Sequence, residues 1–90
     1  MANFLDYNIK SCQELLDKIN RIRLFASEKR LSSFEGINKR YFDLVMRLKT
    51  VRNEGQAKKL EKSIREELLG LEHNSQVRAE LWRINGQDKP

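Results

Sequence analysis

Cysteine and histidine, the residue types most often used for nucleophilic and metal chemistry, each occur once in this 90-residue chain. Cys12 lies among apolar residues with no histidine nearby in sequence, which favours a buried structural thiol over an activated nucleophile. His73 cannot form a typical zinc site alone, and no set of ligands accompanies it. We therefore expect no catalytic residue, metal or cofactor, and we predict that the protein is not an enzyme.

Anion binding by basic residues is a second candidate chemistry. If the helices on either side of residues 53–55 form an antiparallel hairpin, a group of basic side chains gathers at its tip, where phosphates of nucleic acid could be bound. Acidic residues are interleaved with this group, so a solvated helix surface is the competing interpretation. No helix-turn-helix, zinc-finger or aromatic RNA-binding pattern supports the interpretation as a nucleic-acid-binding site. The basic residues are Arg47, Lys49, Arg52, Lys58, Lys59, Lys62 and Arg65.

Protein binding is the third candidate and the preferred one. Phe42 and Met46 lie beside the main apolar stripe of their helix rather than on it, and so widen its apolar face. Trp82 lies about 100° around its helix from Leu81, which places it at the edge of the core or in an interface. A helical core contacts each helix from two sides, which is the ordinary explanation for part of the additional apolar width of these helices.

The elements that must position these residues are helices. Apolar residues in the segment 34–51 recur at spacings of three and four, which keeps them on one side of a helix and excludes a strand. This stripe comprises Phe34, Ile37, Tyr41, Leu44, Leu48 and Val51. Ser32 and Glu35 have the spacing of a capping box, so we expect this helix to span about Ser33 to Arg52. Gly55 then marks a tight turn at residues 53–55, with a left-handed backbone after the helix.

Similar stripes predict a first helix from near Asn3 to about Ser27–Arg30 and a third helix from about Gln56. The first helix has two adjacent stripes, so it can contact two neighbours. Residues 73–76 leave two interpretations open: a loop, in which Asn74 or Ser75 caps a short fourth helix, or an uninterrupted third helix. The stripes are Leu5, Ile9, Cys12, Leu16 and Ile19, with Leu15, Ile22 and Phe25 beside them; Ala57, Leu60, Ile64, Leu68 and Leu71; and Val77, Leu81 and Ile84.

These patterns predict an all-α fold, a small antiparallel bundle of three long helices, with the short fourth helix left open. We expect one helical domain over residues 1–84, a stop at Asn85-Gly86 and a flexible tail over residues 85–90. The chain is basic, with a formal net charge of +5 and a pI near 9.6, which favours anionic partners: nucleic acid, a membrane surface or an acidic protein. No apolar run is long enough to span a membrane, and a single cysteine without a signal peptide favours the cytoplasm.

The function predicted from these observations is a small protein-binding module, such as a regulator, adaptor, inhibitor or chaperone-like protein, that acts through helix–helix packing. Phe42, Met46 and Trp82 are its predicted contact residues. A nucleic-acid-binding protein that uses the basic hairpin tip is the alternative. The apolar width of the first two helices also leads us to expect a homodimer or an obligate partner.

Overall fold

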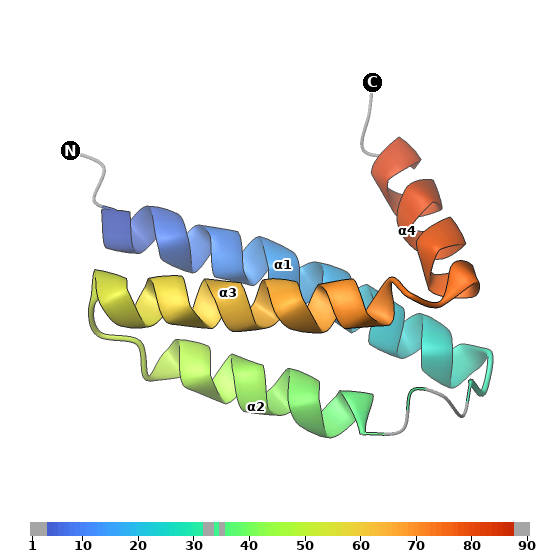
Figure 1. Cartoon of the computed structure of the whole chain (residues 1–90), viewed down its shortest axis with the longest axis horizontal. Helices are drawn as coiled ribbons and strands as arrows, with labels where there is room; N and C mark the ends of the chain where they lie inside the picture. Colours follow the sequence, from blue (N-terminus) through green and yellow to red (C-terminus); the bar gives the residue numbers. More distant parts are fainter. Residues whose placement is uncertain (1–3, 32–33, 35, 88–90) are drawn as a thin grey trace.

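The computed structural model describes residues 4–31, 34 and 36–87, and every regular element among them is a helix. The helices are α1 (Phe4–Glu28), α2 (Ile37–Lys49), α3 (Glu54–Leu71) and α4 (Ser75–Gln87). Figure 1 shows α1 and α3 side by side in the same direction, with α2 antiparallel to both. The predicted small antiparallel bundle is therefore confirmed, and the open question at residues 73–76 is decided in favour of a fourth helix.

The core lies between α1, α2 and α3, with Val77 and Leu81 of α4 added at one end, and is built mostly from the predicted stripes. Tyr41, Leu48 and Val51 are half-buried against it, while the side chains of Leu5 and Ile84 lie outside the described part of the chain. α1 packs against all three other helices, one more than the two neighbours predicted from its adjacent stripes. Buried members are Cys12, Leu15, Leu16, Ile19, Ile22, Phe34, Ile37, Leu44, Ala57, Leu60, Ile64, Leu68, Leu71, Val77 and Leu81.

A glycine determines where α2 begins. Gly36 has φ of 82°, a left-handed conformation that a right-handed helix does not contain. The turn before it is closed by the Phe34 amide, which donates to the Leu31 carbonyl at 3.2 Å. The predicted start at Ser33 is therefore wrong, and α2 begins at Ile37. Ser32 and Glu35, the predicted capping box, lie outside the described residues.

Asn53, rather than Gly55, forms the junction between α2 and α3. Its side-chain oxygen accepts from the Gln56 amide at 2.9 Å, and the Gln56 side chain accepts from the Arg52 amide at 2.8 Å. The first bond satisfies a backbone donor that a helix start otherwise leaves without a partner, and the second ties the Gln56 side chain to the connection before α3. Gly55 lies in the first turn of α3 without a positive φ. The predicted turn at residues 53–55, with a left-handed Gly55, is thus wrong, because the turn ends at Asn53.

A second asparagine starts α4. The Asn74 side-chain oxygen accepts from the amides of Gln76 at 2.8 Å and Val77 at 3.2 Å. From this cap α4 turns away from α3 and packs against α1 (Figure 1). It continues to Gln87, so the predicted stop at Asn85-Gly86 is wrong, whereas the flexibility of the tail stays a prediction. None of the described helices is long and apolar enough to cross a membrane.

Candidate protein-binding surface

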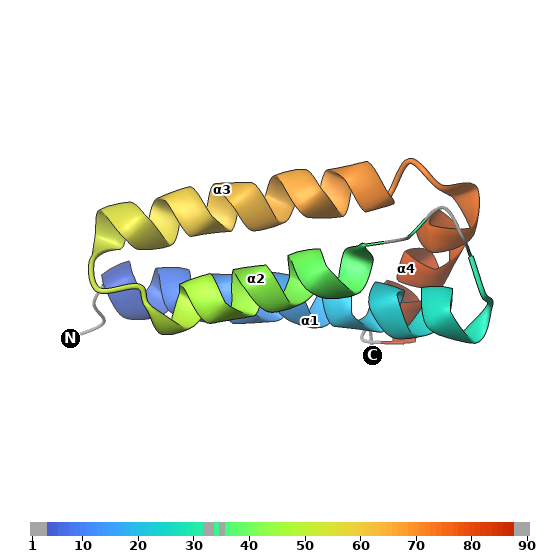
Figure 2. The same ribbon diagram turned by 90° about the horizontal axis from the view of Figure 1, so that it is seen from below.

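The outer side of α2 carries two adjacent exposed apolar side chains. Phe42 is 52% exposed and Met46, one turn later, is 58% exposed. Lys39 precedes them and Lys49 follows them, each three positions away and both exposed. We call these four residues the α2 stripe, because spacings of three, four and three keep them on one side of the helix. In Figure 2, α2 lies in front of α1 and no other helix covers it.

Arg23 of α1 fixes the rings at the edge of this stripe. Its guanidinium carbon lies 5.2 Å from the centroid of the Tyr41 ring and 5.3 Å from that of Phe42, within the range of a cation–π contact. The two rings meet edge to face, with centroids 5.1 Å apart. Arg23 also donates to the Asn20 side-chain oxygen, at 2.7 Å from Nη2, and to that of Asn38 at 3.2 Å. Phe42 is therefore held in a defined position although half of it faces solvent.

An open depression of about 210 Å³ lies next to Arg23, where the end of α1 meets the start of α2. Its apolar lining comes from Ala26, Leu31, Phe34 and Ile37. Arg23 and Asn38 line its border, together with Arg30 and Ser27. Arg23 lines this depression and also contacts Phe42, so it lies between the depression and the α2 stripe.

The third predicted contact residue lies elsewhere. Trp82 is 80% exposed on α4, and Figure 1 shows α2 and α4 on opposite sides of the α1–α3 pair. Leu24 and Leu69 are also exposed, at 53% and 61%, outside the α2 stripe. The structure thus brings together Phe42 and Met46 but separates both from Trp82.

The basic residues predicted at the hairpin tip are divided into paired and unpaired ones. Lys58 forms an ion pair with Glu54 at 2.9 Å, and Arg65 forms one with Glu61 at 2.9 Å. Lys49 belongs to the α2 stripe, whereas Arg52 and Lys62 are exposed on the loop and on α3. Arg47 and Lys59 line an open depression of about 220 Å³ between α2 and α3, with Thr50, Val51, Gln56 and Leu60. Arg47 and Lys59 have no ion-pair partner among the described residues, nor have Lys49, Arg52 and Lys62, so within this group only Lys58 and Arg65 are paired.

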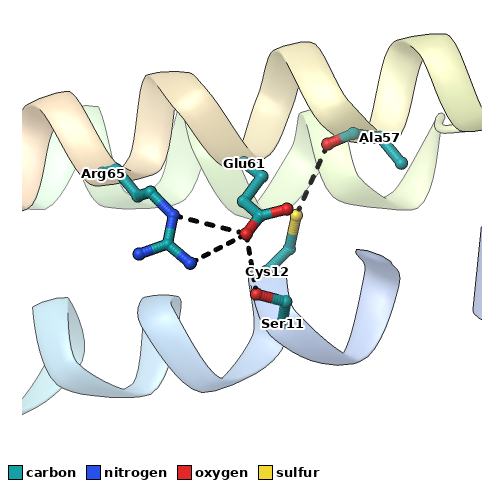
Figure 3. Close-up of polar contacts among 5 residues, drawn as sticks. All are labelled: Ser11, Cys12, Ala57, Glu61 and Arg65. Atoms are coloured by element: carbon teal, nitrogen blue, oxygen red, sulfur yellow. Dashed lines mark hydrogen bonds and ion pairs between the residues drawn. The ribbon is translucent and has the colours of Figure 1, made fainter. Parts of the chain in front are cut away.

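A polar cluster joins α1 to α3 behind this tip (Figure 3). Glu61 accepts from Ser11 at 2.9 Å and from Arg65 Nη2 at 2.9 Å. The hydrogen bonds from Arg65, together with that from Ser11, lower the pKa of the Glu61 carboxyl. Cys12 is fully buried beside this cluster, with its thiol 3.8 Å from the Ala57 carbonyl oxygen that it faces. The cluster fixes the register of α1 against α3.

The geometry gives neither candidate residue for covalent or metal chemistry an evident partner. Burial raises the pKa of the Cys12 thiol, which disfavours the reactive thiolate. His73 is exposed in the loop before α4, where its backbone carbonyl accepts from Arg78 at 3.1 Å. Among the described residues, no three side chains of His, Cys, Asp or Glu are grouped so as to hold a metal ion.

The sequence predicted Phe42 and Met46 as contact residues, but it did not predict the contacts of Arg23 with Asn20, Asn38 and the two rings. The spacing of Asn20 and Arg23 is compatible with a bond along one helix, yet the contact of Arg23 with Asn38 and the rings depends on how α1 packs against α2. Comparison with known proteins adds no further constraint, since no protein-family model, curated protein or solved structure matches the chain significantly.

Proposed function

We propose that this protein is a small, non-enzymatic protein-binding module and that its α2 stripe receives a helix of another protein. The observation that carries the proposal is the pair Phe42 and Met46, both more than half exposed and one turn apart. Such a pair along a helix is the usual anchor pattern for helix-to-helix contacts. Burying both side chains against a partner removes apolar surface from water, which favours association.

The position of Phe42 supports the same proposal. Loss of side-chain freedom opposes binding, and a side chain already held in place loses less of it. Arg23 holds the Phe42 ring through the contact at 5.3 Å and is itself held by Asn20 and Asn38. Aromatic residues with this kind of support commonly contribute most of the affinity of an interface. Trp82, on the other side of the molecule, serves a separate contact in this proposal.

Affinity capture from the source cells tests the proposal. The wild-type protein, Phe42→Ser and Leu24→Ser are immobilised, and bound proteins are compared after nuclease treatment. Leu24 is the matched control because its exposure, 53%, is nearly that of Phe42, 52%, while it lies outside the α2 stripe. We expect a partner that the wild type and Leu24→Ser retain and Phe42→Ser loses. Equal retention by all three proteins would exclude the α2 stripe as the binding surface.

Nucleic-acid binding remains the second candidate, and one observation favours it. Arg47 and Lys59 line the same depression at the hairpin tip, without acidic partners among the described residues. In this case affinity for an arbitrary oligonucleotide falls steeply with salt, because bound phosphates release counterions. The double change Arg47→Ala/Lys59→Ala flattens that dependence, whereas Phe42→Ser has no effect. Tight oligonucleotide binding at physiological salt, lost in the double variant, would favour this function over the first.

A further inference from the structure

Resting on the proposed function, we infer the class of partner: an amphipathic helix whose apolar side chains are flanked at both ends by carboxylates. The inference starts from the charge of the α2 surface. Lys39 and Lys49 are exposed at the two ends of the stripe, and Arg23 lies over the Phe42 ring at its side. All three are basic, so positive charge lies at both ends of the apolar pair and at one side of it.

The acidic residues of this region are few. α2 contains four basic residues and one acidic residue, Asp43. Of its other two basic residues, Arg40 reaches α3, where its Nε lies 2.5 Å from Glu67, and Arg47 lines the depression at the hairpin tip. Neither Lys39 nor Lys49 has an ion-pair partner among the described residues. A partner with carboxylates at matching positions therefore gains attraction that an uncharged or basic helix lacks.

Spacing along α2 sets the spacing expected in the partner. Lys39 and Lys49 are ten positions apart, which corresponds to about 15 Å along a helix axis. A helix lying nearly parallel to α2 therefore presents its two carboxylates about ten residues apart. Apolar residues at spacings of three and four between them contact Phe42 and Met46. The depression lined by Leu31, Phe34 and Ile37 receives a further apolar side chain at one end.

Charge also argues against a second copy of this chain as the occupant. Two α2 stripes packed face to face bring Lys39 and Lys49 of both copies into one interface, where like charges repel. An anionic lipid surface has suitable charge, but the exposed apolar part of the stripe is only two side chains long, less than a membrane-bound helix presents. A helix with acidic ends satisfies both the charge and the limited apolar area.

A displayed peptide library tests this inference. Each peptide carries leucines at helical spacings of three and four, and Glu, Lys or Gln is allowed at positions on either side. Selection against the wild-type protein should enrich Glu about ten residues apart. A peptide of the enriched sequence should bind roughly tenfold more weakly to Lys39→Glu/Lys49→Glu, since two exposed ion pairs each contribute modestly. Its twin with Lys in place of Glu should regain binding to that variant.

The outcomes separate this inference from the proposed function. Enrichment of Lys or Gln in peptides that Phe42→Ser fails to bind would overturn the acidic partner and leave the α2 stripe as a helix-binding surface. Peptides that bind Phe42→Ser as well as wild type, or no enrichment at all, would overturn both. Concentration-dependent dimerisation lost in Phe42→Ser, or binding to phosphatidylserine vesicles lost in that variant, would replace the acidic helix with a second copy or a lipid surface.

Discussion

At the scale of single residues, Asn8 is the polar side chain least well satisfied within the described part of the chain. It is 7% exposed, and its Nδ2 is buried without an acceptor there. A buried donor without a partner destabilises the folded state by about 1–3 kcal/mol. We predict that Asn8→Leu, which has a similar shape, raises the free energy of unfolding by about 1 kcal/mol in urea denaturation.

The matched control for that change is Asn20, whose oxygen accepts from Arg23 at 2.7 Å. Asn20→Leu should lower stability because it removes a bond that holds Arg23. If Asn8→Leu is destabilising as well, the buried Asn8 amide is satisfied by a hydrogen bond in the folded protein.

Glu61 gives stability a defined pH dependence. Its pKa is lowered in the folded protein from an ordinary value of 4.5, chiefly by hydrogen bonds from Arg65. A carboxyl whose folded pKa lies below its unfolded pKa contributes stability above the unfolded value, and this contribution is lost as pH falls through the folded one. Glu61→Gln should therefore cost about 1 kcal/mol at pH 7 and progressively less below pH 4.5.

Urea titrations at pH 7 and near pH 3 measure this difference. Glu54→Gln is the control, because Glu54 forms an exposed pair with Lys58 on α3 alone and should contribute only a few tenths of a kcal/mol. A loss for Glu61→Gln that stays constant down to pH 3 would contradict the assignment of this pH dependence to the carboxylate.

At the scale of helices, we expect substitution of glycine by alanine to have opposite effects on stability at positions 36 and 70. Gly36 has φ of 82°, and an added Cβ there would also lie 3.0 Å from the Arg40 side chain, so Gly36→Ala should destabilise by about 1 kcal/mol. Gly70 lies in the last turn of α3, where an added Cβ meets nothing within 4 Å. Gly70→Ala should stabilise by about 0.5–1 kcal/mol, because alanine favours the helix.

Thermal unfolding of the two variants, measured side by side by circular dichroism, tests this pair. Similar changes in Tm of the same sign would mean that the left-handed start of α2 is not a constraint on the fold.

The helices also show which features of the fold could be predicted from the sequence and which could not. Apolar spacing predicted most of the core, because burial of one side of a helix is encoded in residues three and four apart, whereas Ile9 and Phe25 of the predicted stripes are only half-buried. Helix ends depended on single hydrogen bonds and dihedral angles. Gly36, placed in the predicted first turn, instead has the left-handed conformation, and Gly55, expected in it, is helical. Glycine allows both conformations, so its position alone does not decide between them.

The candidate surface could be predicted only in part, for a related reason. Exposure of Phe42 and Met46 follows from their place beside, rather than among, the core-facing apolar residues of α2. The separation of Trp82 from them depends on the direction that α4 takes after Asn74, which no periodicity encodes. The contact of Arg23 with Asn38 and Phe42 likewise joins two helices and has no signature within either one.

At the scale of the whole molecule, the described Cα atoms span 41 × 34 × 18 Å, a thin shape that leaves the outer side of α2 uncovered. Leu44 faces inward from the same helix and is 7% exposed. Leu44→Asp should unfold the protein, because an unpaired buried charge costs several kcal/mol, comparable to the stability of a small domain. Phe42→Asp, the same charge on the outer side of α2, should lower Tm by only a few degrees. Comparable loss of helical signal in both variants would mean that α2 is buried on both sides.

The homodimer expected from sequence stays a prediction, and the lysines of the α2 stripe argue against that surface as its interface.

The most direct test of protein binding by the α2 stripe is photo-crosslinking in the source cells. A photoreactive amino acid replaces Met46 in one protein and Leu69 in another, two apolar positions that are 58% and 61% exposed on different helices. We predict a discrete covalent adduct with another protein from position 46, none of that size from position 69, and its loss when Phe42→Ser is added. The same adduct from both positions, or an adduct from position 46 that persists in Phe42→Ser, would contradict the assignment of the α2 stripe as a protein-binding surface.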